Sequence, residues 1–322
     1  MRSEPLDRVE FDATKLIDAH PPQWRHPNKQ TVFDLVRSAG SAFEGRVIYS
    51  RWREQRLPSK ITGSTHVDIR PGGFTYSVPA SGSGVEWHMN FADPYLFVGY
   101  DSPFLAQDEL QVLEHPILGS LREALDSSET PAETLDARHR PTPITVSGVQ
   151  RHCAIDTLPD PKAGDPQGLY GSAFARASAS QVISATRLIL PPTTSNILAI
   201  AAPAGGDGDY NSAEIAYIAT AAYTGFLAAL WESAELLGPG ARTIIHTGFW
   251  GCGAFRGNRV LMTILQALAA QLAGVDLMFH AFDRVGVALE AYLRYTEMAC
   301  SMTGVSEMLA ALAREKYQWG EN

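Results

Sequence analysis

Four carboxylates lie close together between residues 93 and 109. They are Asp93, Asp101, Asp108 and Glu109, all within 17 positions of one another. Asp93 follows an apolar stretch that predicts a buried strand, so we expect it at a strand end, where ligands bind in open α/β sheets. Carboxylates beside a sugar act as general acid or base, or stabilise an oxocarbenium-like transition state. A Mg²⁺ site, or a set of surface and helix-capping acids, would give the same pattern, and the spacing leaves all three interpretations open.

A glycine-rich loop, HTGFWGCGAFRGN, spans residues 246–258 between an apolar strand and an apolar helix. Its four glycines let the backbone turn tightly and approach a ligand, and free amides at the next helix N-terminus favour an anion. The loop is neither a Walker A sequence, because Asn258 follows Gly257, nor a dinucleotide fingerprint, because its spacing is GxGxxxG. A phosphate-binding loop and a turn needed only for helix–sheet packing both remain open.

An alternation of strands and helices predicts the elements that position these two segments. We expect apolar strands at 196–203, 242–248 and 275–282, and helices at 212–237 and 260–274. This alternation is typical of a mostly parallel sheet with helices on both faces. Upstream we expect strands at 84–93 and 149–156, a helix at 105–113, a mostly helical segment 1–60, and a polar surface excursion at 120–145.

Composition and charge narrow the class of protein. The 322 residues allow two domains or one large one. With 26 basic and 35 acidic residues, the net charge of −9 argues against a nucleic-acid partner held through its phosphates. Three distant cysteines predict no zinc ribbon and no disulfide framework, and they fit a reducing compartment. Residues 21–60 are locally basic, with eight basic and three acidic side chains, which indicates a solvated face or a docking surface for an acidic partner.

One uncharged stretch, residues 215–231, has 17 positions, at the lower limit of a membrane-spanning helix. It is only weakly hydrophobic and is flanked by glutamates, so we expect a buried core helix and no membrane partner. The N-terminal residues are charged and lack the apolar core of a signal peptide. We therefore expect a cytoplasmic protein, and specialised secretion is compatible with the same observation.

Several motifs together resemble the poly(ADP-ribose) glycohydrolase branch of the macrodomain superfamily. The segment TGFWGCGAFRGN, followed by VLMTILQALAA, is similar to that family's late loop, TGxWGCGAFGGD, and the helix after it. NFAD (90–93) and QDE (107–109) are similar in order and spacing to the family's DFAN and QEE motifs. CAID (153–156) and VDLMFHAFD (275–283) resemble two further strand ends, so the likeness spans about residues 84–285.

The resemblance implies an α/β fold: a macrodomain-like three-layer α/β/α mixed sheet, with a helical accessory region at 1–60 and a catalytic domain at 61–322. It also implies an ADP-ribose cleft. The loop from Gly251 to Gly257 would wrap the diphosphate, Phe255 would pack on the distal ribose, Phe282 would stack on adenine, and the acids would lie beside the anomeric carbon. The residues implied to bind ADP-ribose are Phe91, Ala92, Gln107, Gly251, Cys252, Gly253, Ala254, Phe255, Arg256, Gly257 and Phe282. No metal or other cofactor is required, and Mg²⁺ is not implied.

The sequence also departs from the family pattern. Val98-Gly99-Tyr100 replaces a GGG loop, Phe249 replaces an Asn, Asp108 replaces the first Glu of QEE, Asp93 replaces the Asn of DFAN, and Asp101 is additional. An extra aspartate pair suits a guanidinium group, which binds carboxylates bidentately. The pattern is similar to the subgroup that removes mono-ADP-ribose from arginine.

Our leading hypothesis is therefore an ADP-ribosyl-arginine hydrolase, with ADP-ribose and an arginine-modified protein as partners. Asp93 and Asp101 would orient the guanidinium and ribose hydroxyls, and Asp108 or Glu109 would activate water or assist departure. The alternatives are a poly(ADP-ribose) glycohydrolase, a non-catalytic ADP-ribose reader, and a hydrolase of nucleotide sugars or NAD-derived metabolites.

Overall fold

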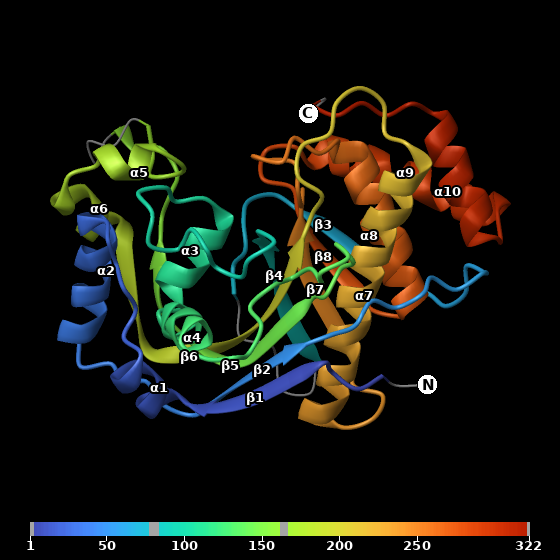
Figure 1. Cartoon of the computed structure of the whole chain (residues 1–322). Helices are drawn as coiled ribbons and strands as arrows, with labels where there is room; N and C mark the ends of the chain where they lie inside the picture. Colours follow the sequence, from blue (N-terminus) through green and yellow to red (C-terminus); the bar gives the residue numbers. More distant parts are fainter. Residues whose placement is uncertain (1–2, 77–83, 162–166, 321–322) are drawn as a thin grey trace.

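The computed structural model describes residues 3–76, 84–161 and 167–320. Eight strands form one sheet that runs through the molecule, with helices on both sides (Figure 1). The strands are β1 (Asp7–Asp12), β2 (Arg46–Arg51), β3 (Val67–Arg70), β4 (Val85–Ala92), β5 (Ile144–Ile155), β6 (Thr186–Ala201), β7 (Thr243–Gly248) and β8 (Asp276–His280). Their order across the sheet is β1-β2-β5-β6-β4-β7-β8-β3.

The sheet is parallel in one half and antiparallel in the other. Strands β6, β4, β7, β8 and β3 pair in parallel. Strands β1, β2, β5 and β6 pair antiparallel, and irregularities interrupt the β5–β6 register at two places. The expected mixed sheet is therefore present, and the mostly parallel pairing predicted from the last third of the chain is correct for that half. Because β4, β7 and β8 run in the same direction, the residues that follow them meet at one edge.

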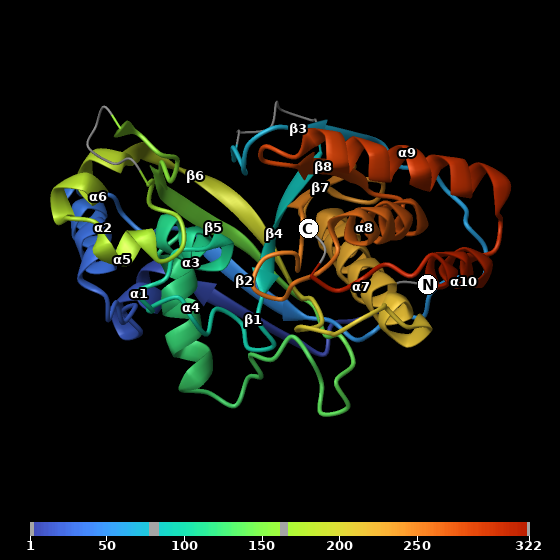
Figure 2. The same ribbon diagram turned by 90° about the horizontal axis from the view of Figure 1, so that it is seen from above.

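Two groups of helices cover the sheet (Figures 1 and 2). One group contains α1 (Ala13–Ala19), α2 (Pro27–Ser38), α3 (Gln107–Glu114), α4 (Ile117–Asp126), α5 (Ala173–Arg176) and α6 (Ala179–Ala185). The other contains α7 (Ser212–Leu237), α8 (Arg259–Ala273), α9 (Val285–Ser301) and α10 (Val305–Arg314). Each group packs its own hydrophobic core, one chiefly against β2 and β5 and the other against β4 and β7.

Helix α7 contains the uncharged stretch of residues 215–231. Over the described residues it is the one helix long and apolar enough to cross a membrane by length and composition. It packs in the core: a Cβ on Gly225 would lie 2.3 Å from Ile200 Cδ1 of β6, so the helix approaches the sheet too closely for a side chain there. Asn211 caps its start by accepting hydrogen bonds from the amides of Ala213 and Glu214.

Two expectations about secondary structure are wrong. Residues 1–60 contain α1 and α2, but they also supply β1 and β2, which extend the central sheet. The alternating exposure along DRVEFD is that of a half-buried strand, a pattern too short to stand out among helical signals. The expected surface excursion at 120–145 begins inside α4, where Ser120, Leu121 and Leu125 are buried. The domain boundary at residue 60 stays a prediction.

Candidate active site

The acidic cluster and the glycine loop meet at one cavity of about 150 Å³. Its walls come from the end of β4, the start of α3 and the loop after β7. The predicted site residues that line it are Phe91, Ala92, Asp93, Gln107, Asp108, Glu109, Gly251, Gly253, Ala254 and Phe255. A second cavity of about 690 Å³ shares Phe91, Gln107 and Tyr170 with the first, so the two adjoin. Phe282 lines the larger cavity.

Four predicted site residues line neither cavity. Asp101 forms an ion pair with Arg25, with Nε and Oδ2 2.8 Å apart. The Gly257 amide donates to the Gly251 carbonyl at 2.8 Å and so closes the glycine loop. Cys252 is buried, and Arg256 has a positive φ of 59° within the same loop. The structure thus brings three of the four predicted carboxylates to the cavity and leaves Asp101 at a neighbouring ion pair.

Gln107 anchors the start of α3 to the end of β4. Its side-chain Oε1 accepts from the Phe91 amide at 2.8 Å, and its Nε2 donates to the Met89 carbonyl at 2.9 Å. Both ends of the amide are therefore occupied by strand backbone. This side chain, predicted as a ligand contact, positions the helix that carries Asp108 and Glu109.

The carboxylates of α3 are perturbed by burial. Asp108 is only 7% exposed, and its Oδ1 accepts from Asn90 Nδ2 at 2.7 Å. Burial, and next the charge of Glu109, raise the pKa of Asp108 to about 7. Burial likewise raises the pKa of Glu109, whose Oε2 accepts from the Ala106 amide at 2.8 Å, and the pKa of Asp93. A carboxyl group that keeps its proton near neutral pH can act as a general acid.

A buried lysine that the sequence did not single out lies beside these acids. Lys29, in the first turn of α2, is fully buried and donates from Nζ to the Tyr100 carbonyl at 2.6 Å. Burial lowers its pKa to about 8, against the opposing effects of Glu109, Asp108 and Asp101. Part of the basic N-terminal segment therefore faces the acidic cluster of the same chain.

The N-terminal segment also holds the loop that replaces GGG. Tyr100 Oη accepts from the Gln23 amide at 2.7 Å and donates to Glu123 at 2.5 Å. The Trp24 ring meets the Tyr100 ring edge-on, with centroids 5.1 Å apart. A Cβ on Gly99 would lie 3.0 Å from Glu109 Oε1, so this single glycine lets the loop lie directly on Glu109.

The glycine loop has the geometry of a tight turn leading into a helix. Gly251 has φ +73°, and a Cβ there would lie 2.6 Å from Ala202 Cβ. Gly253, in contrast, faces open space at the cavity. Asn258 caps α8 by accepting from the Leu261 amide at 3.0 Å, and its own amide donates to Tyr210 Oη at 3.0 Å.

Phe282 is held in an unusual backbone conformation at the larger cavity. Its φ is +51°, a left-handed value that is rare for an aromatic residue. Two backbone hydrogen bonds with Gly72, of 3.0 and 3.2 Å, fix it there, and a Cβ on Gly73 would lie 3.4 Å from its ring. The partly exposed ring is thus presented to the cavity.

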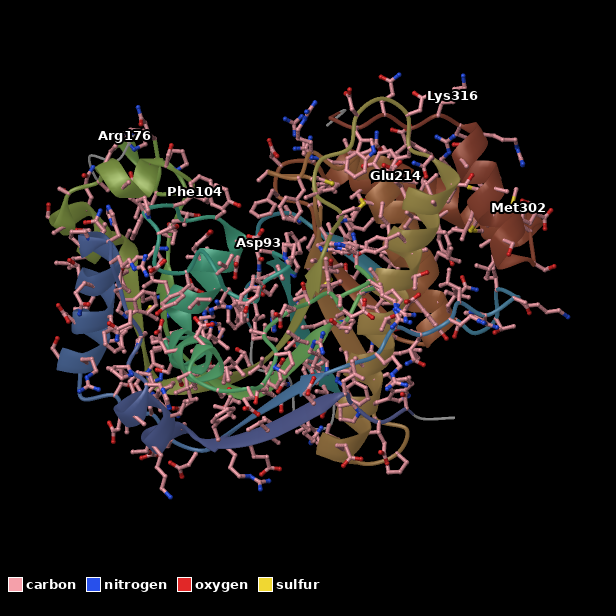
Figure 3. The ribbon with its side chains drawn as sticks, viewed as in Figure 1. Asp93, Phe104, Arg176, Glu214, Met302 and Lys316 are labelled. Atoms are coloured by element: carbon pink, nitrogen blue, oxygen red, sulfur yellow. The ribbon has the colours of Figure 1, made fainter. Side chains whose placement is uncertain are left out.

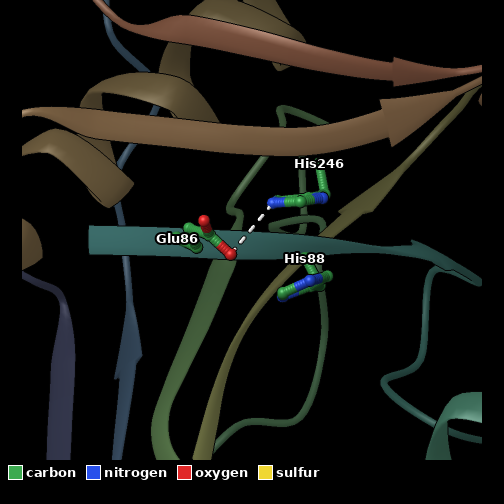
Figure 4. Close-up of side chains that lie close together, drawn as sticks. All are labelled: Glu86, His88 and His246. Carbon is green, nitrogen blue, oxygen red and sulfur yellow. Dashed lines mark ion pairs between the residues drawn. The ribbon is translucent and has the colours of Figure 1, made fainter. Parts of the chain in front are cut away.

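Behind the larger cavity lies a row of buried rings on strands β4, β7 and β8. Glu86, His88 and His246 offer metal-type ligand atoms within 4.8 Å of one another, and Glu86 Oε2 lies 3.2 Å from His246 Nε2 (Figure 4). However, the His88 and His246 rings stack, with centroids 4.2 Å apart and planes 20° apart. A metal ion lies in the plane of each imidazole ring that it binds, about 2.1 Å from the nitrogen. Because the His88 and His246 rings are stacked and nearly parallel, one ion cannot lie in both ring planes at that distance.

The histidines therefore form a ring stack that supports the cavity. Tyr76, which lines the larger cavity, stacks on His88 at 4.1 Å. Burial lowers the pKa of His88 well below its usual value, which keeps that ring neutral. The expectation that no metal is needed stays a prediction.

Comparison with known proteins gives one family match. Residues 170–288 match the family model described as poly(ADP-ribose) glycohydrolase (PARG), macro domain fold. This segment contains β6, α7, β7, the glycine loop and β8, and it confirms the resemblance to the PARG-like macrodomain branch. The acidic cluster lies outside the matched residues.

Similar solved structures carry the same family name. The PARG of Thermomonospora curvata bound to the inhibitor ADP-HPD is 17% identical, over 71% of this chain and 78% of that chain, at a TM-score of 0.43. Another structure of the T. curvata enzyme is 16% identical in sequence, and the match covers 88% of this chain and 97% of that chain at a TM-score of 0.43. The PARG of Deinococcus radiodurans in complex with ADP-ribose is 16% identical in sequence, and the match covers 91% of this chain and 95% of that chain at a TM-score of 0.42.

Proposed function

We propose that this chain is a PARG-like glycohydrolase that binds ADP-ribose and cleaves the glycosidic bond at C1 of its distal ribose. The observation that carries the proposal is the convergence of Asp93, Asp108 and Glu109 with Gly251 and Gly253 on one cavity. A set of surface acids, or a glycine turn needed only for packing, would not require this convergence. The family match over residues 170–288 supports the same activity.

In the proposed complex, the distal ribose lies in the smaller cavity beside the acids. The diphosphate follows the glycine loop at Gly251 and Gly253, which line the smaller cavity and let the backbone approach it closely. The adenine extends into the larger cavity toward Phe282. In this proposal the two adjoining cavities hold the sugar, the phosphates and the base in their covalent order.

The reaction needs an acid and then a base. We assign both steps to the Asp108–Glu109 pair, whose pKa values are raised by burial. The pair gives its proton to the leaving oxygen or nitrogen as the bond to ribose C1 breaks, and it accepts a proton from the water that attacks C1. Asp93 orients the ribose hydroxyls. Because all the protons come from water and these side chains, the scheme requires no cofactor.

Two substrates compete, and the comparisons favour the polymer because the matched family is named for it. One observation favours arginine-linked mono-ADP-ribose as a second candidate: Asp101, absent from the family pattern, pairs with the guanidinium of Arg25 at 2.8 Å. A carboxylate that binds one guanidinium beside the cavity is chemically suited to receive that of a modified arginine.

The test is release of ADP-ribose from poly(ADP-ribose) and from proteins modified on arginine, serine and glutamate. Asp108→Asn and Glu109→Gln should each abolish release from every accepted substrate. Asp101→Asn should reduce release from arginine alone if arginine is the substrate. Asp68→Asn is the matched control, because Asp68 also pairs with an arginine, at 2.7 Å from Arg70, and lines neither cavity.

Each outcome decides between the candidates. Release from the polymer with no effect of Asp101→Asn would establish the glycohydrolase and remove the arginine candidate. Tight ADP-ribose binding in calorimetry without release from any substrate would leave a reader. Neither binding nor release would refute the proposed function.

A further inference from the structure

A short segment after α10 runs along the loop that leads into α7 (Figure 1). It comprises residues 317–320, and we name it the clamp segment. The Tyr210 amide, directly before α7, donates to the Tyr317 carbonyl at 2.8 Å. Figure 3 shows Lys316, which precedes the segment, in the same part of the molecule as Glu214 in the first turn of α7. The clamp segment therefore lies beside a loop that is distant in sequence.

Trp319 anchors the clamp segment in the hydrophobic core. It is only 7% exposed, and its ring stacks on the Tyr210 ring, with centroids 4.1 Å apart and planes 18° apart. Its amide donates to the Gly208 carbonyl at 2.9 Å. A Cβ on Gly206 would overlap the indole ring, so the loop before α7 lies directly on Trp319. Both the ring and the backbone of Trp319 are thus fixed.

The clamp segment and Tyr210 hold the end of the glycine loop by its backbone. The Gly320 amide donates to the Arg256 carbonyl at 2.7 Å. The Asn258 amide donates to Tyr210 Oη at 3.0 Å, and Asn258 Nδ2 donates to the Gln318 carbonyl at 3.3 Å. The loop is therefore tied at Arg256 and again at Asn258.

Arg256 needs such a tie because of its backbone conformation. Its φ of +59° is left-handed, and a residue other than glycine keeps this conformation only where the surrounding structure fixes it. The Arg256 amide donates to the carbonyl of Gly253, which lines the smaller cavity, at 2.9 Å. The two backbone hydrogen bonds of Arg256 thus connect Gly320 to the cavity wall. Residues 317–320 line neither cavity, so they act on a ligand through the loop.

We propose that the clamp segment holds the glycine loop in the conformation that receives the diphosphate of ADP-ribose, with Trp319 as a positioning residue. The inference rests on the proposed function, which places the diphosphate along Gly251 and Gly253. It deepens that function by assigning part of the affinity for the diphosphate to residues outside the family match over 170–288.

The test compares ADP-ribose with adenosine, which lacks the diphosphate and would occupy only the larger cavity. Trp319→Ala removes the stack on Tyr210 and should weaken ADP-ribose binding in calorimetry about tenfold, while adenosine affinity stays within about twofold. Trp319→Phe keeps an aromatic ring and should restore ADP-ribose affinity to within about threefold. Tyr210→Phe keeps the stack and removes only the oxygen that accepts from the Asn258 amide, so it should weaken ADP-ribose binding about 2- to 10-fold. This variant tests the proposal independently if Trp319→Ala does not fold.

The control is Met308→Ala on α10, which removes a fully buried side chain from the same core. It should lower Tm and change neither affinity. Hydrogen–deuterium exchange gives a readout that needs no ligand. The peptide covering residues 251–257 should exchange faster in Trp319→Ala than in Met308→Ala, because the variant at 319 releases the loop locally.

The outcomes separate this inference from the proposed function. ADP-ribose affinity that is unchanged in Trp319→Ala and Tyr210→Phe overturns the inference, and so does an equal loss of ADP-ribose and adenosine affinity. Exchange that is no faster than in the control also overturns it. If the unaltered protein binds no ADP-ribose, the proposed function fails, and the exchange measurement still decides whether the clamp segment holds the loop.

Discussion

Replacing Asp108 by Asn should stabilise the protein at alkaline pH while removing activity. Asp108 is 7% exposed, and its pKa is raised from 3.8 to about 7, chiefly by burial and next by the charge of Glu109. The fold therefore disfavours the ionised form. Between about pH 4 and pH 7 the folded state binds more protons at this site than the unfolded state does, so this site destabilises the fold increasingly as pH rises through that range.

The size of the effect follows from the two pKa values. A difference of about three pH units corresponds to roughly 4 kcal/mol at pH 8 and to about 1.5–2 kcal/mol at pH 5. Asparagine keeps the oxygen that accepts from Asn90 at 2.7 Å and cannot ionise. Its new N–H donor costs about 1 kcal/mol if it stays unpaired. We therefore expect Asp108→Asn to be more stable by about 2–4 kcal/mol at pH 8, with an advantage about 2–3 kcal/mol smaller at pH 5.

The assay is urea denaturation of both proteins at pH 5 and pH 8, with release of ADP-ribose measured in parallel. Asp34→Asn, on the exposed side of α2, is the control and should change stability by less than about 0.5 kcal/mol at either pH. The reasoning would be refuted if the Asp108 variant were less stable at pH 8, or if its advantage were the same at both pH values.

Three further predictions concern other parts of the site. Lys29→Met removes a positive charge that lowers the pKa of Asp108 and Glu109. The ionisations on which kcat/KM depends should therefore move to higher pH by about one unit. An unchanged pH profile would contradict this role of Lys29. Phe282→Ala should weaken ADP-ribose binding in calorimetry by about 5- to 150-fold, the value of a base–aromatic stack of about 1–3 kcal/mol, while kcat stays within about threefold. Gly251→Ala should lower Tm, because the new Cβ would lie 2.6 Å from Ala202 Cβ at a φ of +73°. Gly253→Ala is the control and should leave Tm unchanged, because a Cβ at Gly253 faces open space. Equal Tm values for the two variants would count against the loop geometry.

The sequence predicted the parallel half of the sheet and the two segments that form the smaller cavity. Both predictions depended on local patterns: apolar runs with helix-length spacing, and glycines or acids grouped at element ends. Because parallel strands end at one edge, local patterns at the ends of β4 and β7 were sufficient to bring Asp93 near Gly251.

Residues that reach the site through tertiary packing were not predictable in this way. Lys29 lies far from Asp108 in sequence and meets it because α2 packs beside α3. His88 and His246 stack because they are register partners on neighbouring strands, and no pattern within either strand encodes that register. The ion pair of Asp101 with Arg25 likewise depends on the path of the N-terminal segment.

The pairing of β2 with β5 has a consequence for solubility. In a shortened chain that starts at residue 61, β1 and β2 would be missing, and the first part of β5, residues 144–147, would become an edge with unpaired amides and carbonyls. The residues of β5 that now pair with β2 include Ile144 and Val146, so the new edge would be apolar as well as unpaired. We expect such a chain to self-associate through this edge, so the N-terminal residues protect the sheet from aggregation in addition to supporting the acidic cluster.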